Sequence, residues 1–309
     1  MRASASSGAR VEDPSVIFSR LQPRMLGTAY RMLGSLAEAE DVVQDVWTRW
    51  HGTDIGSVEN AEAWLVATTT RRAIDRLRQA RVEREKYVGI WLPEPVLTES
   101  PATPEELHEA SSDLSIAFLT VLERLAPEAR AAFLLREVLD VDYDEIANII
   151  GKTEAACRQI VHRAKAHLRD ARKRYAVSDE AHRDLMRRFL AALSSGDLAG
   201  MKRMFAESAV LVGDGGGIVT SFPRPMVGGP RVAQVLFAAT LGAKRDPTMD
   251  LRVELATING RAGVLRYMHG VLESTQFYDT DGERIVGVYM QRNPEKLRRI
   301  AARRVYALR

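Results

Sequence analysis

Residues 142–170, DYDEIANIIGKTEAACRQIVHRAKAHLRD, decide the fold of the middle of this chain. Apolar residues recur at helical spacing on both sides of Gly151. Glycine permits the positive φ that a sharp turn between two helices needs, and the small side chain of Ala147 lets the helices approach closely. Thr153 can cap the second helix. The stretch therefore predicts two short helices joined by a tight turn, which is a helix-turn-helix.

The second of these helices has a polar face suited to DNA. Arginine and glutamine are the usual readers of guanine and adenine in the major groove, and basic side chains beside them can contact phosphates. A solvated basic face on a generic helical hairpin is the alternative, but spacing and charge together favour DNA. Cys157 lies on the apolar side, where we expect core packing. The residues expected to face DNA are Thr153, Glu154, Arg158, Gln159, His162, Arg163 and Lys165.

Composition bounds the class of protein. A chain of 309 residues has room for two or three domains of about 100–200 residues each. No apolar run approaches the roughly 20 residues that span a bilayer, so we expect a cytoplasmic protein. The single cysteine excludes an internal disulfide and a cysteine-rich metal site, and neither a metal nor a cofactor is expected. The pI of about 9.0 and the clustering of basic residues indicate an anionic partner.

A second basic helix is predicted in residues 60–81, NAEAWLVATTTRRAIDRLRQAR. A basic helix beside an aromatic side chain can hold single-stranded nucleic acid, because its charge follows the backbone and a pocket accepts an unstacked base. A packed tryptophan with a solvated arginine face is the alternative, which the presence of two basic helices in one chain makes less favourable. The candidate residues are Asn60, Trp64, Arg71, Arg72, Asp75, Arg76 and Arg78.

Changes in residue composition and hydrophobic pattern divide the chain into five segments. The prolines after Gly89 exclude a helix there, but Ile90, Trp91 and Leu92 are too apolar for a solvated tether, so we expect this linker to dock. The segments predicted are a polar, disordered leader (1–13), a helical domain (14–88), the proline-rich linker (89–112), the helix-turn-helix domain (113–175) and a C-terminal domain (178–309).

The C-terminal segment changes from helical to alternating patterns. Two helices are predicted between residues 178 and 205, followed by strands that include 261–273 as one stretch. Asn259-Gly260 and Asp281-Gly282 are two-residue hairpin signals. The pattern therefore predicts an α+β domain with a largely antiparallel sheet and helices on one side.

The residues of the helical half resemble bacterial sigma factors of the extracytoplasmic-function class. Residues 37–50 resemble the helix that docks on the clamp of RNA polymerase, residues 63–81 the part that opens and reads the −10 element, and residues 125–169 the domain that reads −35. Many members of the class carry Asn where this chain has Arg71. By this resemblance the polymerase-binding residues are Asp41, Gln44, Asp45 and Trp47.

The rest of the chain resembles a narrower group, the sigma factors with a C-terminal SnoaL-like domain. YVGIWLPEPV (87–96) is similar to their linker signature, and GDGGG (213–217) and NPEKL (293–297) to the two signatures of the attached domain. Relatives usually carry a basic residue at the position of Ile218, and Arg224 is the candidate replacement. The fold implied is two all-α sigma domains followed by an α+β SnoaL-like cone with a curved, mostly antiparallel sheet.

The function implied is that of a monomeric sigma factor, not an enzyme, which directs transcription initiation on core RNA polymerase through its clamp and flap regions. Two basic surfaces separated by a long linker would bind the −10 and −35 elements of promoter DNA, each weakly, and gain by linkage. The C-terminal domain would modulate this activity by docking on the sigma domains. The residues expected to dock are Trp91, Leu92, Pro93, Glu94, Pro95, Asp214, Gly215, Gly216 and Gly217.

Three alternatives remain open at this point. The cone of the C-terminal domain can hold a small apolar ligand, which would shift the arrangement only by binding one form better. The domain could instead be a cyclase or isomerase that uses Asp214, His269 and Tyr289 for proton transfer, with His269 placed on a strand. The chain could also be a DNA-binding regulator that works without polymerase. The glycines at 213–217 lack the Lys-Ser/Thr of a phosphate-binding loop.

Overall fold

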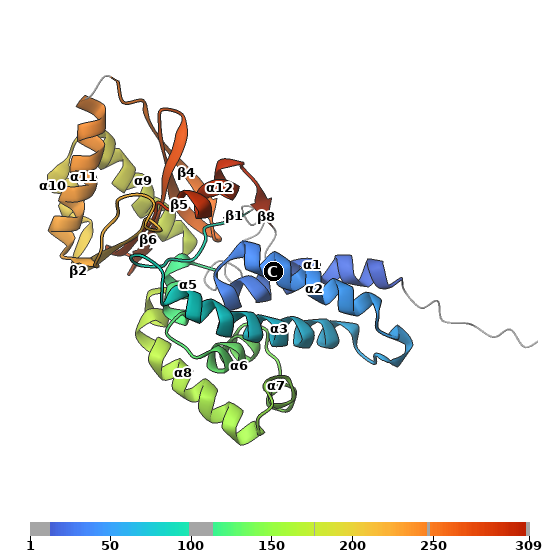
Figure 1. The fold of residues 1–309 in the computed structure, drawn as a ribbon. Helices are drawn as coiled ribbons and strands as arrows, with labels where there is room; N and C mark the ends of the chain where they lie inside the picture. Colours follow the sequence, from blue (N-terminus) through green and yellow to red (C-terminus); the bar gives the residue numbers. More distant parts are fainter. Residues whose placement is uncertain (1–12, 99–113, 176, 246–247, 307–309) are drawn as a thin grey trace, which may run out of the picture.

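A computed structural model of the protein describes residues 13–98, 114–175, 177–245 and 248–306 (Figure 1). The predictions for the leader before Asp13, and for linker residues 99–112, lie outside these ranges. Helices form the first half of the described chain, and a sheet with its own helices forms the second.

Three long helices form the N-terminal part. Each begins at a residue whose side chain accepts a hydrogen bond from the first turn: Asp13, Ser35 and Asn60. Trp50 and Leu65 are buried between the helices. The elements are α1 (Pro14–Leu33), α2 (Leu36–His51), the 3-10 turn η1 (Ile55–Ser57) and α3 (Ala61–Arg84).

The helix-turn-helix is confirmed. Gly151 ends the first of its helices with φ of 68°, and Cys157 is buried against the helix before the turn. The elements of this domain are α5 (Ile116–Leu122), α6 (Pro127–Glu137), α7 (Tyr143–Ile150) and α8 (Glu154–Tyr175).

The last part is α+β, as predicted. In the described portions of the chain, no helix combines the length and apolar character needed to cross a bilayer. The helices are α9 (Asp179–Ser195), α10 (Leu198–Arg203), α11 (Gly229–Arg245) and α12 (Pro294–Ala301). The strands are β1 (Leu97–Thr98), β2 (Phe205–Asp214), β3 (Met226–Val227), β4 (Leu251–Ile258), β5 (Arg261–Met268), β6 (Val271–Thr280), β7 (Ile285–Gln291) and β8 (Val305–Tyr306).

These strands form one sheet in the order β3-β2-β7-β6-β5-β4-β1-β8. The pairs are antiparallel except β2 with β7 and β1 with β8, so the mostly antiparallel prediction holds and two parallel pairs are added. The linker supplies β1: Leu97 pairs with Ile258 on one side and with Val305 on the other. A segment predicted as a docked tether is therefore built into the sheet.

Helices cover both faces of the sheet, which corrects the prediction of helices on one side. On one face α9, α10 and α11 enclose a core that includes Phe189, Phe205 and Tyr278 (Figure 1). On the other, α5, α12 and the linker pack against residues such as Leu265 and Phe277. The second face is covered because it is where the helical half of the chain meets the sheet.

The hairpin at Asn259-Gly260 is confirmed, with φ of 52° and 75°. The prediction of one continuous stretch over 261–273, with His269 on a strand, was wrong. His269 and Gly270 also have φ of 52° and 75° and form the turn between β5 and β6. A residue followed by glycine can supply the two positive φ values of such a turn, and histidine tolerates this region better than most residues.

Buried His182 predicts acid sensitivity. Its Nε2 lies 3.0 Å from the carbonyl of Tyr278, and burial, reinforced by Arg261 and Arg183, lowers its pKa from 6.5 to about 4. Below pH 6.5 the unfolded chain therefore binds a proton that the folded chain refuses, so stability falls as pH drops toward 4, by up to about 3 kcal/mol. His182→Gln should flatten this fall in urea unfolding at pH 7 and pH 4.5. If the free energy of unfolding fell equally between pH 7 and pH 4.5 in the wild type and in His182→Gln, His182 would not be the source of the acid sensitivity.

Candidate nucleic-acid and interdomain surfaces

The polar face of α8 is open to solvent. Thr153 caps the helix, accepting a hydrogen bond from the amide of Ala156 at 3.3 Å. Arg158 pairs with Glu154 at 2.8 Å and lies over the ring of Tyr143. All seven residues predicted to face DNA are exposed: Thr153, Glu154, Arg158, Gln159, His162, Arg163 and Lys165.

The basic helix α3 packs against the helix-turn-helix domain. Arg71 donates to the carbonyls of Ile149 (3.3 Å) and Asn148 (3.2 Å) at the end of α7. Arg78 pairs with Glu128 of α6 at 2.5 Å. The last carbonyls of a helix lack intrahelical partners, so an arginine that reaches them stabilises the contact. The two helical sigma domains, predicted to be separated by a long linker, therefore touch in this arrangement, while the polar face of α8 stays exposed.

The other residues assigned to −10 binding are spread along α3. Arg76 pairs with Glu38 at 3.0 Å, and Asp75 pairs with Arg78 at 3.1 Å. Trp64 packs on Trp50, with ring centroids 5.3 Å apart, and Arg72 is half-buried. Asn60 uses its side chain to cap α3.

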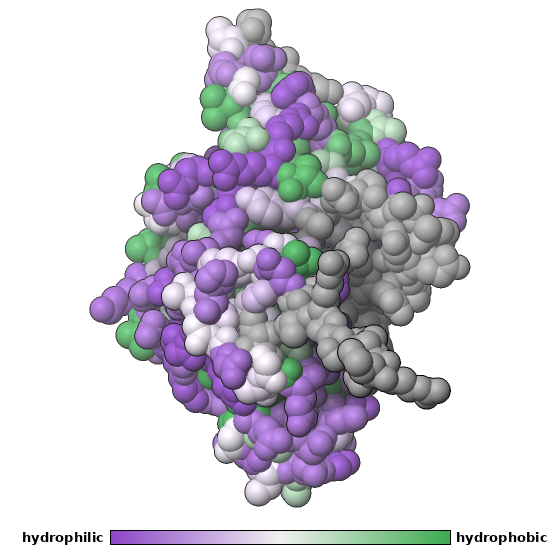
Figure 2. All heavy atoms as spheres, turned by 90° about the vertical axis from the view of Figure 1, so that its right-hand side faces the viewer, coloured by the Kyte–Doolittle hydropathy of each residue, from purple (hydrophilic) through white to green (hydrophobic). Residues whose placement is uncertain are grey.

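The predicted polymerase-binding face lies on α2. Asp41, Gln44 and Asp45 are exposed, and Trp47 packs edge-on against Phe18 at 4.7 Å. A groove of about 550 Å³ runs beside Trp47, and Tyr306 lines it from the far end of the chain. Outside the grey atoms, the side of the molecule in Figure 2 is mainly hydrophilic, with apolar residues in small separate spots. Because Tyr306 lines the groove beside Trp47, strand β8 lies next to the α2 face assigned to polymerase.

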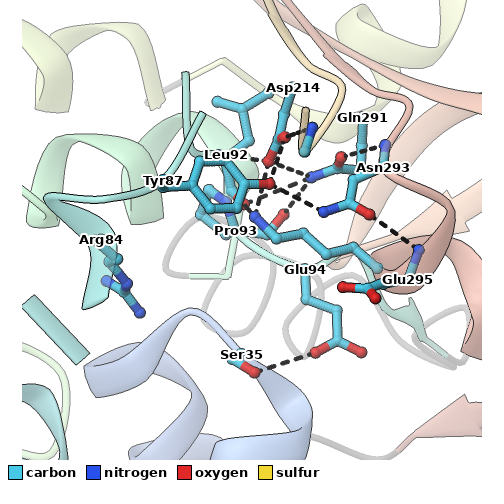
Figure 3. Close-up of polar contacts among 12 residues, drawn as sticks. Ser35, Arg84, Tyr87, Leu92, Pro93, Glu94, Asp214, Gln291, Asn293 and Glu295 are labelled. Atoms are coloured by element: carbon cyan, nitrogen blue, oxygen red, sulfur yellow. Dashed lines mark hydrogen bonds and ion pairs between the residues drawn. The ribbon is translucent and has the colours of Figure 1, made fainter. Parts of the chain in front are cut away.

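A buried carboxylate joins the C-terminal domain to the linker. Asp214, at the end of β2, is fully buried and accepts hydrogen bonds from both parts of the chain (Figure 3). Its donors are the Tyr87 hydroxyl (2.6 Å), the Leu92 amide (2.9 Å), Lys296 Nζ (2.7 Å), Gln291 Nε2 (3.1 Å) and the Gly216 amide (2.9 Å).

Burial shapes the electrostatics of this cluster. It lowers the pKa of Lys296 to about 8, although Asp214 favours the charged form. It also raises the pKa of the Tyr87 hydroxyl, as does the hydrogen bond to Asp214. Lys296 Nζ lies 4.3 Å from the ring centroid of Trp91 and donates to the Leu92 carbonyl at 2.7 Å. One ammonium group therefore contacts the carboxylate, the linker backbone and an indole ring.

The loop after Asp214 approaches the linker closely. Gly216 and Gly217 both have positive φ, 65° and 71°. A Cβ at Gly217 would lie 2.9 Å from Cβ of Val88, and one at Gly216 would collide with Asn293. A side chain at Gly217 would therefore push the loop off the linker, and one at Gly216 would push it off the start of α12. Ile218 is 56% exposed, and Arg224 is also exposed.

A second junction forms around Glu94. Its carboxylate accepts from the Leu36 amide at 2.8 Å, at the start of α2, where a negative charge is favourable. Arg299 of α12 donates to the same carboxylate at 3.1 Å and pairs with Glu40 of α2 through two bonds of 3.0 and 2.7 Å. The Tyr30 hydroxyl donates to the Glu94 carbonyl at 2.6 Å. Linker, α2 and α12 thus meet at one point.

A third junction is made by the β4–β5 hairpin turn. Asn259 is fully buried, and its Nδ2 donates to the Tyr30 hydroxyl (2.7 Å) and to the Leu114 carbonyl (2.9 Å). Its Oδ1 accepts from the Val96 amide at 3.0 Å. One turn residue therefore binds α1, the linker and the segment before α5.

Reasoning from sequence missed several residues of these junctions. The NPEKL signature contains two of them, but it was used only to identify the domain. Asn259 is marked in the sequence only as a turn residue and Tyr87 only as part of the linker signature, and nothing local marks the others as interface residues. The missed residues are Tyr30, Glu40, Tyr87, Asn259, Gln291, Asn293, Lys296 and Arg299.

The three candidates for proton transfer lie in different places. Asp214 is enclosed by the linker cluster, His269 is at the β5–β6 turn, and Tyr289 packs between the helical core and the sheet. In the parts of the chain that the structure describes, no group of three His, Cys, Asp or Glu side chains is placed to hold a metal.

Comparison with known proteins finds two sigma-factor regions in the helical half of the chain. Residues 17–83 match Sigma-70 region 2, and residues 115–168 match Sigma-70, region 4. The chain is 36% identical over 248 residues to the ECF RNA polymerase sigma factor SigJ of Mycobacterium tuberculosis, covering 80% of this chain and 78% of that one. It is 32% identical to the probable ECF RNA polymerase sigma factor SigI of the same species, over 56% of this chain and 60% of that one.

The fold also matches the crystal structure of the M. tuberculosis extracytoplasmic function sigma factor SigJ. The TM-score is 0.74 at 28% identity, and the match covers 92% of this chain and 98% of that chain. The likeness therefore extends past the two sigma regions into the C-terminal domain.

Proposed function

This chain belongs to the extracytoplasmic-function RNA polymerase sigma factors, and from this premise we propose that its C-terminal domain restrains it in an inactive arrangement. A sigma factor directs RNA polymerase to promoters and starts transcription there. The main observation behind this proposal is that linker residues Leu92–Leu97 are all buried. Asp214, Asn259 and Arg299 hold them in place.

We propose that the surfaces predicted from sequence do the binding. The α2 face (Asp41, Gln44, Asp45, Trp47) would contact the polymerase clamp, α3 the −10 strand, and α8 the −35 groove. The exposure of the α2 and α8 residues supports this assignment. Alanine at Gln159 should weaken initiation at promoters with an intact −35 element, measured by transcription in vitro. An unchanged preference among −35 variants would contradict the role of α8.

The distance between the −10 and −35 elements on DNA supports the proposal that this arrangement is inactive. Two elements about 25 base pairs apart are separated by about 85 Å, at about 3.4 Å per base pair. In this structure α3 touches α6 and α7, so the two DNA-binding helices cannot reach both elements. Initiation therefore requires the sigma domains to separate.

The length of free linker limits how far the two sigma domains can separate. With residues 92–98 bound to the C-terminal domain, residues 99–115 are left, and they span at most about 60 Å when fully extended. With the whole segment 85–115 free, the reach rises to about 105 Å. Release of the linker would therefore lengthen the connection between the two sigma domains and favour the required separation, and docking would oppose it.

The test is reconstituted transcription with core polymerase. We expect a chain that ends before Ser178 to initiate several-fold more efficiently than the full-length protein. Arg252→Gln, an exposed change on β4, is the matched full-length control and should leave initiation unchanged. Equal activity of the truncated and full-length proteins would remove the proposal.

We also propose that the C-terminal domain binds and does not catalyse, and that the protein acts as a monomer on the polymerase. The separation of Asp214, His269 and Tyr289 supports the first point. Loss of activity on a small molecule after His269→Ala would contradict it, and a dimer in sedimentation of the polymerase-free protein would contradict the second.

A further inference from the structure

The C-terminal domain contains a cavity that neither the DNA surfaces nor the linker junctions use. It lies between α9, α11 and the sheet and measures about 530 Å³. Its walls include Phe189, Leu193, Phe222, Leu236 and Met290. This size and this apolar lining are typical of sites that enclose a small organic molecule.

Charged groups line one part of this cavity. Arg266 of β5 and Arg292, just after β7, both border it, and Glu273 of β6 lies between them. Glu273 is 2.5 Å from Arg292 Nη2 and 3.7 Å from Arg266 Nη1. Two guanidinium groups share one carboxylate, so these three side chains leave one positive charge uncompensated.

Both arginines are also held by backbone carbonyls. Arg266 donates to the Ala239 carbonyl at 3.2 Å, and Arg292 to the Thr220 carbonyl. These bonds hold both guanidinium groups at the edge of the cavity. A carboxylate is the acceptor that best matches a guanidinium.

We propose that this cavity binds an amphipathic monocarboxylate. Its apolar body would lie against Phe189, Leu236 and Met290, and its carboxylate would accept hydrogen bonds from Arg266 and Arg292. The charge excludes a purely apolar ligand as the preferred occupant, because such a ligand would leave the excess positive charge beside it without a counter-charge. The regulatory part of this inference rests on the proposed function, but the ligand class does not.

The end of β7 connects the cavity to the linker. Side chains alternate across a strand, so Met290 and Arg292 line the cavity while Gln291 and Asn293 reach the junction at Asp214 and Tyr87. The amide of Arg292 donates to the Asp214 carbonyl at 2.7 Å. The 214–222 loop spans the same two places, with Asp214 on the linker and Phe222 in the cavity. A bound carboxylate would therefore stiffen this loop and favour the docked linker.

The ligand class can be tested by calorimetric titration of the full-length protein with matched pairs. 2-Naphthoate and decanoate should bind saturably, and 2-naphthamide and decanamide at least about tenfold more weakly. Arg292→Gln should cost at least about tenfold in affinity for the carboxylates and less than about twofold for the amides. Arg252→Gln, outside the cavity, should change neither.

A change of opposite sign separates binding from folding. Glu273→Gln removes the competing carboxylate at almost constant shape, so 2-naphthoate should bind several-fold more tightly; a damaged fold would bind it more weakly. Absence of saturable binding by both carboxylates, or equal affinity for acids and amides, overturns the ligand class.

The coupling is tested by amide hydrogen exchange at Leu92, whose N–H donates to Asp214. Saturating 2-naphthoate should slow this exchange several-fold in the wild type and leave it unchanged in Arg292→Gln. Unchanged or faster exchange in the wild type overturns the coupling. Transcription does not enter either measurement, so failure of the proposed function would be seen separately, in the truncation experiment.

Discussion

Asp214→Ala should lower the free energy of unfolding by about 3–5 kcal/mol and raise initiation by the full-length protein. The carboxylate is fully buried and accepts five hydrogen bonds, two of them from Tyr87 and Leu92 on the linker side. Its removal leaves the ammonium of Lys296 buried without its counter-charge, and leaves the Leu92 amide without an acceptor. The linker loses its tightest attachment, so the sigma domains separate more readily.

Urea unfolding at pH 7 measures the first effect, and reconstituted transcription the second. Asp184→Ala on the exposed side of α9 is the matched control, and we expect a cost below about 1 kcal/mol there. Combining Asp214→Ala with Lys296→Met should recover part of the lost stability, because it removes the unpaired charge. A loss below about 1 kcal/mol for Asp214→Ala, or a double variant no more stable than the single one, would contradict this account.

The fate of Asp214 also shows how far the sequence alone could go. Its glycine-rich surroundings and the family signature marked the loop 213–217, and the proline pattern marked the linker as too apolar to be free. Tyr87 and Lys296 fall within the linker and NPEKL signatures, but no signature shows that they or Gln291 contact Asp214, from which they are 77 to 127 residues away. Such partners depend on the packing of the whole sheet, and no local periodicity records it.

The helical half was predictable for a physical reason. Helices are held by local hydrogen bonds, so cap residues such as Asn60 and the turn glycine Gly151 mark where its helices begin and end in the sequence. In the sheet, the hairpin at Asn259-Gly260 was predictable, but the one at His269-Gly270 was not. The two-residue strand β1 has no periodicity to detect, and its pairing with β8 joins residues about 200 positions apart.

The packing of α3 on α7 was missed for another reason. Arg71 was interpreted as a DNA contact because its charge and helix are suited to one. The structure shows that the same guanidinium satisfies the last carbonyls of α7. A basic residue on a helix suited to DNA can therefore stabilise a contact between two domains, and sequence alone reports only the charge.

Asn259→Asp is the second change with a large expected effect, about 3 kcal/mol or more of lost stability. The substitution keeps the shape of the side chain and tolerates the positive φ of the turn, so the hairpin itself should survive. The NH₂ group, however, donates to the Tyr30 hydroxyl and to the Leu114 carbonyl. A carboxylate cannot donate, and it would face the Leu114 oxygen in a fully buried site.

The pH dependence of this loss distinguishes a charge effect from a packing effect. Burial raises the pKa of the new carboxyl group in the folded state above its unfolded value. The folded variant then binds a proton that the unfolded variant releases at neutral pH, so the loss should shrink as pH falls through the folded pKa. Urea unfolding of Asn259→Asp should therefore approach that of the wild type on acidification, with exposed Asn148→Asp as the control that stays near the wild type throughout. A loss that does not change with pH would mean that the turn contributes shape alone, and that its hydrogen bonds to α1 and to the segment before α5 do not hold the sigma domains to the sheet.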